Sequence, residues 1–257
     1  MIKDSAYFEF DNEYSYDYDI INCNLSSGMT EEPFVAEVEI IETEIRGRNE
    51  PYFQEVKPKP LILDLVFAFK KGWTEESLQR VKRWLRKPYY AKMRFSENPD
   101  KIYYCILISD PQISHNGINQ GYITCQFRCK SSYAHSHIYL ESYDFSKEST
   151  NHFVFNNLGD VDVLPIITIK KLEKGKVSIL NLSNGKEFGF SELEDNEIVQ
   201  IDCKRRNIES SLESTPPPIY RYDKLINNYY MNLPYGINRL KVDGKCLLDM
   251  KYEFRFY

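Results

Sequence analysis

The sequence predicts a mainly β protein that carries one amphipathic helix and is divided into two domains. Short runs in which apolar and polar residues alternate are typical of strands, and the clearest runs cover residues 61–69 and 246–256. The turn pairs Asn184-Gly185 and Asp243-Gly244 favour tight connections between such strands. The chain has 257 residues, of which 42% are hydrophobic, so it is long enough for two cores.

The first domain is expected to cover residues 1–145 as a β-sandwich that carries the helix. Asp11-Asn12 predicts a turn after the first strand. Residues 46–53 are expected to form a loop, since the glycine, asparagine and proline within them disfavour regular structure. The predicted strands of this domain cover residues 6–10, 17–21, 34–45, 61–69, 89–95, 101–108 and 121–129.

The helix is expected over about residues 74–87, where apolar side chains recur with a helical period. Thr74 is a favourable N-cap, and Glu75 and Glu76 follow in the first turn, where the helix dipole favours acids. Pro88 ends the helix. The apolar stripe consists of Leu78, Val81, Trp84 and Leu85. The basic side chains of the helix region are Arg80, Lys82, Arg83, Arg86 and Lys87.

The second domain is expected to cover residues 146–257 as another β-sandwich. The boundary is placed there because residues 143–151 are polar and lack an apolar period. Both turn pairs are expected to close hairpins. Many short strands separated by turn signals are typical of a sandwich. The predicted strands cover residues 163–172, 176–182, 186–190, 198–203, 237–242 and 246–256.

Charge and composition argue against several classes of function. The formal net charge is −5, whereas general nucleic-acid binding needs a basic footprint. The longest apolar run is interrupted by Asp64 and is too short to span a membrane. The N-terminus lacks the apolar segment of a signal peptide, and the six cysteines are expected to be reduced. With only 11 glycines, Gly-rich nucleotide-binding loops are not expected.

Charge is unevenly distributed along the chain. Residues 1–44 hold twelve acids and one lysine, a balance of −11, so residues 45–257 carry +6. A solvated acidic arm and a solvated helix face would explain this pattern. Head-to-tail contact between copies, in which the acidic and basic patches meet and close a ring, would explain it as well.

The cysteines and histidines after residue 120 invite comparison with a zinc site. Cys125 and Cys129, with His135 and His137, are the right ligand types. The spacing of the two cysteines is unusual for zinc and places both on one face of a strand, which favours core packing. No metal site is expected.

Two other chemistries compete with ordinary packing. The tyrosine pairs Tyr103-Tyr104 and Tyr229-Tyr230 could stack on sugars, or each pair could supply one core and one edge residue. Serine, histidine and carboxylates are all present, but no nucleophile-elbow motif is. No catalytic residues are expected, and the chain is not expected to be an enzyme.

A series of short motifs recurs along both predicted domains. The motifs are Glu31-Glu-Pro-Phe34, Glu42-x-x-Ile-Arg-Gly-Arg48, Pro51-Tyr-Phe53, residues 61–69, Trp84-Leu85, Lys101-Ile-Tyr-Tyr104, Phe127-Arg-Cys129, Ser132-Tyr133, residues 160–169, Ile201-Asp202 and Leu233-Pro-Tyr-Gly-Ile-Asn238. In their order and spacing these motifs together resemble the distal tail proteins of long-tailed, siphovirus-type bacteriophages. The family usually has proline where this chain has Ser132.

The resemblance implies a structural protein of the virion, found at the phage tail tip after assembly in the host bacterial cytoplasm. Six copies would form a ring from their N-terminal domains, with galectin-like C-terminal domains at the periphery. One face would contact the tail tube protein. The other would hold the tail-tip hub, a tail-associated lysin or a fibre protein, with a receptor-binding protein as a further candidate. DNA would pass through the ring without specific binding, and neither a cofactor nor a membrane is implied.

Subunit contacts are expected at the loop and at the helix. Arginine and aromatic residues are enriched at interface hot spots, although the aromatic residues of the loop could instead be core residues. The candidate interface residues are Arg46, Arg48, Tyr52, Phe53, Lys82, Arg83 and Arg86. The alternative function is a carbohydrate-binding β-sandwich module of a phage or bacterial cell-surface adhesion device.

Overall fold

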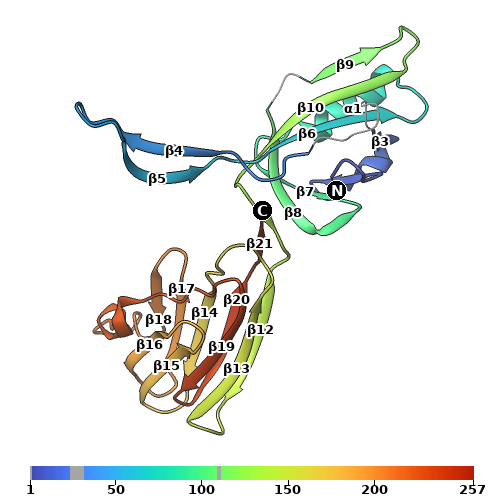
Figure 1. Cartoon of the computed structure of the whole chain (residues 1–257). Coiled ribbons are helices and arrows are strands. Elements are labelled where there is room, and N and C mark those ends of the chain that lie inside the picture. Colours follow the sequence, from blue (N-terminus) through green and yellow to red (C-terminus); the bar gives the residue numbers. More distant parts are fainter. Residues whose placement is uncertain (1, 24–31, 109–110) are drawn as a thin grey trace. The chain divides into compact units, whose positions relative to one another are not determined.

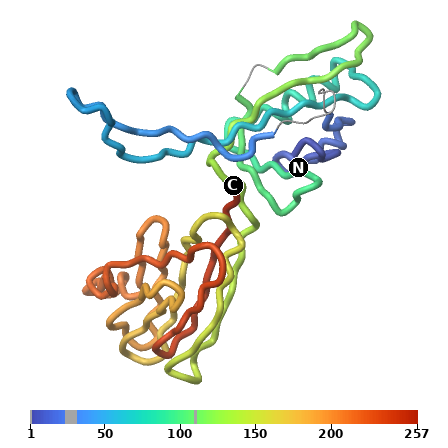
Figure 2. Tube along the Cα trace, viewed as in Figure 1, coloured from blue at the N-terminus to red at the C-terminus, as the bar shows by residue number. Residues whose placement is uncertain are grey.

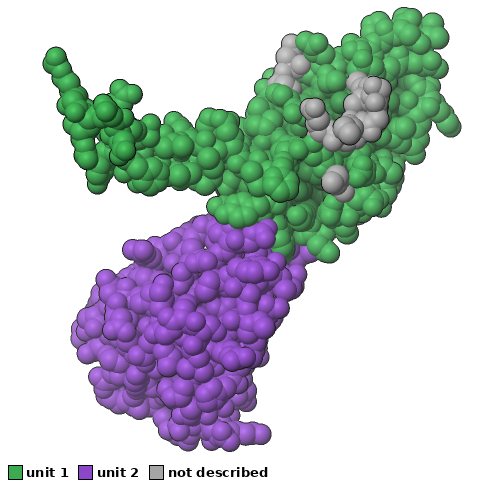
Figure 3. Space-filling view, in the orientation of Figure 1, with its two compact units in different colours: residues 1–136, 256–257 green, residues 137–255 purple. Residues whose placement is uncertain are grey.

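The computed structural model describes residues 2–23, 32–108 and 111–257, so Glu31 of the first motif lies outside the described residues. The chain divides into two compact units (Figure 3): unit 1 holds residues 1–136 and 256–257, and unit 2 holds residues 137–255. The described residues form many strands and one α-helix, which confirms the mainly β prediction. No helix in these ranges is long and apolar enough to cross a membrane.

Unit 1 is built on a ten-stranded sheet (Figure 1). The main path runs β2-β1-β7-β8-β10-β6-β3, while β9 pairs with β10, and β11 pairs with β8 and β21. The strands are β1 (Phe8–Phe10), β2 (Glu13–Tyr14), β3 (Ile20–Asn22), β6 (Ile62–Phe69), β7 (Ala91–Phe95), β8 (Asn98–Leu107), β9 (Gln112–His115), β10 (Gly121–Cys129), β11 (Ala134–His135) and β21 (Arg255–Phe256).

Turn chemistry determines where the first strands begin and end. Asp11 and Asn12 both have a left-handed backbone, with φ of 56° and 64°, so β1 and β2 pair across a two-residue turn as predicted. The strand expected over residues 17–21 is partly wrong. Residues Ser15–Tyr18 form the 3-10 helix η1, and strand β3 begins only at Ile20.

Helix α1 (Glu75–Leu85) forms where the sequence predicts it. The Thr74 hydroxyl accepts a hydrogen bond from the Ser77 backbone N–H at 3.2 Å, and the Ser77 hydroxyl accepts one from the Thr74 N–H at 2.9 Å. This reciprocal capping satisfies two N–H groups that a helix start leaves without partners. The predicted apolar stripe is buried, namely Leu78, Val81, Trp84 and Leu85.

Trp84 attaches the helix to the inner face of the sheet. Its ring stacks on Tyr18, with centroids 4.3 Å apart, and on Phe8, with centroids 5.5 Å apart. The indole N–H donates a hydrogen bond of 2.9 Å to the Phe10 carbonyl. The aromatic side chain is 2% exposed, so α1, β1 and η1 meet at one buried residue.

The remaining strands of unit 1, β4 (Val38–Thr43) and β5 (Tyr52–Pro58), form a separate two-stranded sheet. We call residues 38–58 the arm. The chain runs out along β4 and back along β5, away from the ten-stranded sheet (Figure 2). The loop predicted over residues 46–53 is therefore partly wrong, since its last two residues already belong to β5.

Unit 2 consists of two antiparallel sheets whose inward side chains form its core. One sheet has the order β12-β20-β14-β17-β18 and the other has the order β13-β19-β15-β16. The strands are β12 (Tyr139–Phe145), β13 (Thr150–Asn157), β14 (Ile166–Lys171), β15 (Gly175–Asn181), β16 (Lys186–Leu193), β17 (Ile198–Asp202), β18 (Asn207–Ser210), β19 (Gly236–Asp243) and β20 (Cys246–Tyr252). The 3-10 helices η2 (Tyr222–Lys224) and η3 (Ile226–Asn228) lie in the long connection between β18 and β19.

The two units meet in the sequence after residue 136, whereas the predicted boundary follows residue 145. Strand β12 makes the difference, because it pairs with β20 along its whole length and so belongs to unit 2. Residues 143–151, where the polar composition placed the boundary, hold the end of β12 and the start of β13.

The two Gly-containing turn pairs have different outcomes. Asn184-Gly185 lies between β15 and β16, which pair with each other, so this hairpin is confirmed. The hairpin predicted at Asp243-Gly244 is wrong, because β19 and β20 belong to different sheets and the turn crosses between them. Gly244 has φ of +104°, and a Cβ there would lie 2.4 Å from the Lys176 carbonyl oxygen. The sequence identifies such a turn without telling which sheet receives the next strand.

A buried ion pair secures the proline-rich loop of unit 2. Glu197 accepts hydrogen bonds from Nε and Nη2 of Arg221, both at 2.7 Å, and from the Ser210 hydroxyl at 2.7 Å. Burial acts to raise the pKa of Glu197, but these hydrogen bonds and one from the backbone of Glu194 outweigh it, so the pKa is lowered.

Replacing Trp84 should destabilise unit 1 alone. Trp84→Ala opens a cavity and should cost about 3–5 kcal/mol. Trp84→Phe keeps most of the volume but loses the bond to Phe10, which should cost about 1–3 kcal/mol. Hydrogen exchange read by mass spectrometry in increasing urea resolves the two units. Equal destabilisation of unit 2 would contradict the assignment.

Glu197→Gln should destabilise unit 2 by about 3–5 kcal/mol at neutral pH, because it leaves Arg221 buried without a counter-charge. The Glu197 carboxylate, whose pKa is lowered by folding, stabilises the folded chain at pH values above its pKa in the unfolded chain, about 4.3. This stabilisation is lost as the pH falls through the pKa of the folded chain. The wild-type chain should therefore lose this stability below about pH 4.3, and the variant should lack this loss. Thermal unfolding across this pH range checks it, with Glu173→Gln at an exposed pair as control. If the unfolding temperatures of the wild-type chain and of Glu197→Gln fell equally as the pH is lowered, the proposed role of Glu197 would be refuted.

Candidate subunit interface

The seven residues predicted for subunit contacts fall into two groups. Arg46 and Arg48 lie exposed in the turn at the tip of the arm, and Tyr52 and Phe53 begin β5. Tyr52 is 60% exposed and Phe53 is 58% exposed, so the alternative that they are core residues is wrong. The second group consists of Lys82 and Arg83 on α1 and of Arg86, which caps the C-terminal end of this helix.

One face of the arm is apolar. Strand pairing places Val38 opposite Pro58, and Ile40 opposite Val56. The register then shifts by one residue, so Phe53 lies opposite Glu42. Because residues that face each other across strands share a side of the sheet, this irregularity adds Phe53 to the same face. We call these side chains the apolar arm face: Val38, Ile40, Phe53 and Val56.

The apolar arm face is largely exposed among the residues that the structure describes. Its four side chains are between 48% and 60% exposed. A two-stranded hairpin alone is marginally stable in water, and a contiguous exposed apolar patch is typical of an interaction surface. The arm is also acidic, with five acids and three bases.

Some basic side chains of the helix region contact other residues of unit 1, and others form no ion pair with the described residues. Lys87 pairs with Asp11 at 2.6 Å, and this hydrogen bond lowers the pKa of Asp11. The Arg80 guanidinium lies 5.2 Å from the centre of the Tyr18 ring. Within the described ranges, the three predicted residues form no ion pair, namely Lys82, Arg83 and Arg86.

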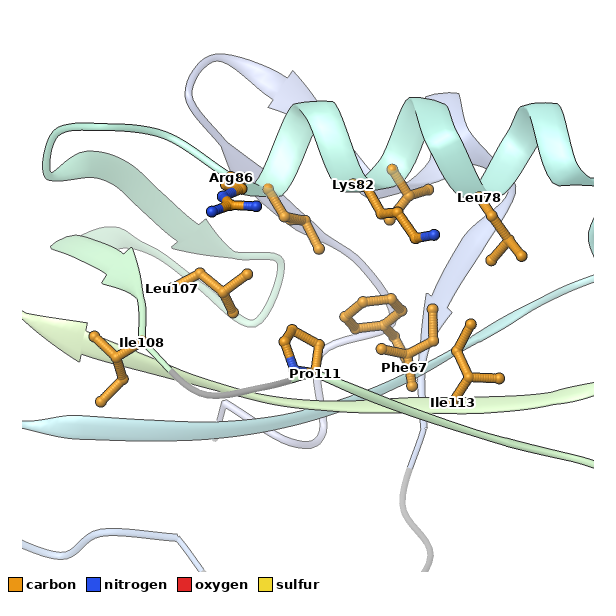
Figure 4. Close-up of a pocket in the computed structure, with 11 residues that line it drawn as sticks. Phe67, Leu78, Lys82, Arg86, Leu107, Ile108, Pro111 and Ile113 are labelled. Atoms are coloured by element: carbon orange, nitrogen blue, oxygen red, sulfur yellow. The ribbon is translucent and has the colours of Figure 1, made fainter.

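Lys82 and Arg86 border an apolar groove beside α1 (Figure 4), and Arg83 does not line it. The groove has a volume of about 520 Å³. Its apolar lining comes from the helix and from strands or adjoining residues far apart in the sequence: Phe67, Leu78, Val81, Leu85, Leu107, Ile108, Pro111, Ile113 and Ile123. From the sequence, only the part of the groove lining that comes from the helix could be predicted, because the apolar stripe of the helix is periodic. The lining residues from the strands resemble ordinary core residues in the sequence.

The structure brings the members of each group together but leaves the two groups apart. The arm extends away from the sheet that carries α1 (Figure 1). The apolar arm face and the groove are therefore two separate surfaces of unit 1.

The cysteines considered as zinc ligands lie in the core of unit 1. Cys125 and Cys129 are 4% and 1% exposed, both on the inward face of β10. Burial raises the pKa of each thiol to about 12, so both are protonated at neutral pH. His135 lies with Nε2 3.0 Å from the Ser131 hydroxyl. No cluster of metal-ligating side chains occurs among the residues that the structure describes.

Three of the four tyrosines in the two pairs contact other parts of the protein. Tyr103 is 7% exposed, and burial raises its pKa to about 12. Tyr104 packs edge-on against the His135 ring. The Tyr229 ring has the Lys186 ammonium 5.4 Å from its centre. Tyr103 is thus the core member of its pair, and the carbohydrate-binding alternative stays a prediction that these contacts do not test.

Two family models match the chain, one for each half. The model described as the phage tail protein N-terminal domain matches residues 3–131. The model described as the phage tail C-terminal domain matches residues 133–252. The SPbeta prophage-derived uncharacterized protein YomH of Bacillus subtilis (strain 168) is 29% identical over 267 residues, which cover 100% of both chains.

Among solved structures, the crystal structure of the Dit (gp 19.1) protein of phage SPP1 has the same fold. The TM-score is 0.67 at 14% identity, over 96% of this chain and 98% of that chain. A chain of the phage P2 baseplate in its activated conformation with Ca gives a TM-score of 0.43 at 10% identity, over 96% and 97% of the chains, which is too weak to establish a shared fold.

The first family model covers half of the chain, and the second covers most of the remainder. The resemblance noted in the sequence is thereby confirmed, and the family is one of structural proteins of the phage tail. The chain belongs to the phage tail protein family and has the distal tail protein fold.

Proposed function

We propose that six copies of this chain form a closed ring at the tip of a phage tail, joining the tail tube to the tail-tip and host-adsorption apparatus. Membership of the phage tail protein family supports a structural role in the tail. The SPP1 protein with the same fold is described as a paradigm of the hub adsorption apparatus in phages that infect Gram-positive bacteria. This description supports the same position for the present chain.

The observation that carries the proposal is the pair of unlike surfaces on unit 1. The acidic arm exposes an apolar face, and α1 presents Lys82, Arg83 and Arg86 beside an apolar groove. A contact between two different patches is heterologous, and repeated heterologous contacts close into a ring when the rotation between neighbours allows it. Opposite charges at the two patches favour contact between different copies over contact between like patches.

The proposed position implies partners on both sides of the ring. The tail tube protein would contact one face. The tail-tip hub, a tail-associated lysin or a fibre protein would bind the other, and unit 2 would offer a docking platform, with a receptor-binding protein as a further candidate. The net charge of −5 supports a ring through which DNA passes without tight binding.

The place of assembly follows from the same proposal. The ring would be built in the host bacterial cytoplasm and become part of the virion. Cys105, Cys125, Cys129, Cys203 and Cys246 are buried as free thiols, as suits a protein made in a reducing compartment. The proposed role is structural and requires neither enzymatic activity nor a cofactor.

Light scattering of the purified chain, with negative-stain images of the same fractions, tests the ring. Six chains of 30.4 kDa give about 182 kDa. The measurement is made over increasing protein concentration, alone and with the tail tube protein, because assembly depends on concentration and partners. Annular particles of this mass are expected. A mass of one chain under every condition would refute the ring.

The triple variant Lys82→Glu, Arg83→Glu and Arg86→Glu should weaken the ring without unfolding the chain. All three side chains are exposed, and none forms an ion pair with the described residues, so the fold loses no contact that these charges make. Light scattering in low and moderate salt checks the assembly, and circular dichroism checks the fold. Rings that persist in moderate salt would exclude charge pairing at α1.

A further inference from the structure

Strand β13 of unit 2 has an outer side that meets no other described strand. It ends the sheet β13-β19-β15-β16 (Figure 1), and its eight residues pair with β19 without a shift of register. Among the described residues, no backbone hydrogen bond reaches the outer side of residues 150–156. An edge strand of this kind presents a row of unpaired N–H and C=O groups to any extended chain that reaches it.

The backbone of every second residue of β13 points to this open side. The Leu182 N–H donates a hydrogen bond of 2.8 Å to the Arg239 carbonyl, and the Arg239 N–H donates one of 3.1 Å to the Ser183 hydroxyl. The backbone of Arg239 therefore faces away from β13. Because Val154 lies opposite Arg239 in an antiparallel pair, its own backbone must point the other way, to the open side. The residues that alternate with this orientation are Thr150, His152, Val154 and Asn156.

The other three edges of the two sheets in unit 2 are protected. On β16, Phe190 forms an antiparallel bridge with Leu225. On β18, the Ile208 N–H donates a hydrogen bond to the Tyr222 hydroxyl. Strand β12 carries Glu141 on its inward side, and inward-pointing charges discourage an added strand. Strand β13 has no such device, since it contains no charged residue, no proline and no bulge.

The outer face beside this edge is apolar around one arginine. Val154 and Leu182 flank Arg239 on its two sides, and Ile237 lies two residues before it on the same face. The three apolar side chains are each more than half exposed. Arg239 is exposed and forms no ion pair with the described residues. An occupant of this face should bring a carboxylate to Arg239 and apolar side chains around it.

The inner side of the same edge also favours apolar side chains. Phe153 points inwards, and its ring centre lies 4.4 Å from that of Tyr143 on β12. Both aromatic side chains are only half-buried, at the side where β12 and β13 end their sheets. A strand added to β13 would place every second side chain next to these rings, so those side chains should be apolar.

A second copy of β13 lacks the chemistry that this surface needs. Because β13 contains no acid, pairing two copies of it would leave both Arg239 side chains without a carboxylate. A strand beside β13 would lie two strand spacings, about 9–10 Å, from β19. An arginine and a glutamate side chain together bridge that gap. The occupant that fits is therefore an extended segment of a different protein, with alternating apolar residues and an acid.

We propose that an extended segment of another tail protein adds to β13 as a fifth strand of its sheet, with apolar side chains beside Phe153 and an acid beside Arg239. The inference rests on the proposed place of the chain in a tail tip, and it names the means by which unit 2 holds a partner. In such strand addition, backbone hydrogen bonds supply the affinity and the alternate side chains supply the specificity.

Hydrogen exchange, read residue by residue with mass spectrometry, compares the purified chain with tails that contain it. The amides of residues 151, 153 and 155 bond to β19 and should exchange slowly in both samples. The outward amides of His152, Val154 and Asn156 should exchange at least about tenfold more slowly in tails, since an added strand bonds to them. Strand β16, whose edge is already covered, is the internal control and should not change.

The outcomes separate this inference from the proposed function. If tails hold the ring but the outward amides exchange as fast as in the purified chain, strand addition is overturned and the ring stands. If both sets of amides slow to the same extent, a partner covers the face without adding a strand, which also overturns the inference. If the outward amides of the purified chain slow as its concentration rises, a second copy is the occupant and the assignment to a different protein is wrong. If tails contain no copy of this chain, the proposed function and the inference both fail.

Proline at the open edge tests the backbone contact. Val154→Pro removes an outward N–H without breaking a bond to β19, and the edge of a sheet tolerates proline at such a position. Tails built from this variant should lose one tail protein by about tenfold relative to the ring, as quantitative mass spectrometry measures. Val154→Ile is the matched control, because it keeps the N–H and an apolar side chain, and thermal unfolding checks that unit 2 stays folded. His152→Pro, at the next outward position, should have the same effect. A full set of tail proteins in the proline variants would overturn strand addition.

Charge at Arg239 tests the acid of the partner. Arg239→Glu should lower the amount of the same tail protein by about fivefold, the upper range for an exposed ion pair. Arg239→Lys, which keeps the charge, should stay within about twofold of the wild-type chain. An unchanged amount in Arg239→Glu would show that the partner brings no acid to this face.

Discussion

The contact of Trp84 with the sheet supports much of unit 1. A helix of eleven residues is too short to be stable alone in water, so α1 depends on tertiary packing. Trp84 supplies that packing by meeting Phe8, Phe10 and Tyr18, which come from segments far away in the sequence. The helix then lies over β6, β9 and β10, and the groove forms between the helix and these strands. The positions of Lys82 and Arg86 therefore follow from one buried indole.

The arm has the opposite physical character. It has no core of its own, and its apolar side chains are about half exposed. Segments with few buried apolar contacts open locally at low free-energy cost. Unit 1 thus combines a firmly packed surface beside α1 with a weakly supported one on the arm. A partner that covers the arm would stabilise the arm. The entropy cost of ordering the arm would lower the net affinity for that partner.

Local sequence signals predicted the features that depend on local chemistry. The N-cap at Thr74, the helical stripe and the Asp11-Asn12 turn each depend on a few neighbouring residues, and all three occur as expected. The turn at Asp243-Gly244 was misjudged, because the choice between pairing and crossing to the other sheet depends on where β13 and β12 already lie. Strand β12 was missed because Leu140 faces outward and Glu141 lies on the more buried side, which obscures the alternation of apolar and polar residues.

The candidate interface was predictable in part for the same reason. Charge placed Lys82 and Arg86 on an exposed helix side, and composition marked Arg46 and Phe53 as hot-spot types. The sequence cannot reveal that Phe53 shares a face with Ile40, since this depends on the shift of register after Ile41. Neither can it reveal the groove, whose lining is assembled from several strands.

The last residues of the chain return to unit 1, where Phe256 packs against the core and β21 pairs with β11. Unit 2 is therefore an insertion, joined to unit 1 by two chain segments rather than one. An inserted domain can be exchanged for another, or enlarged at its loops, while both ends of the host domain keep their places in its sheet. The architecture allows the domain that faces new partners to diversify while the domain that builds the assembly stays the same.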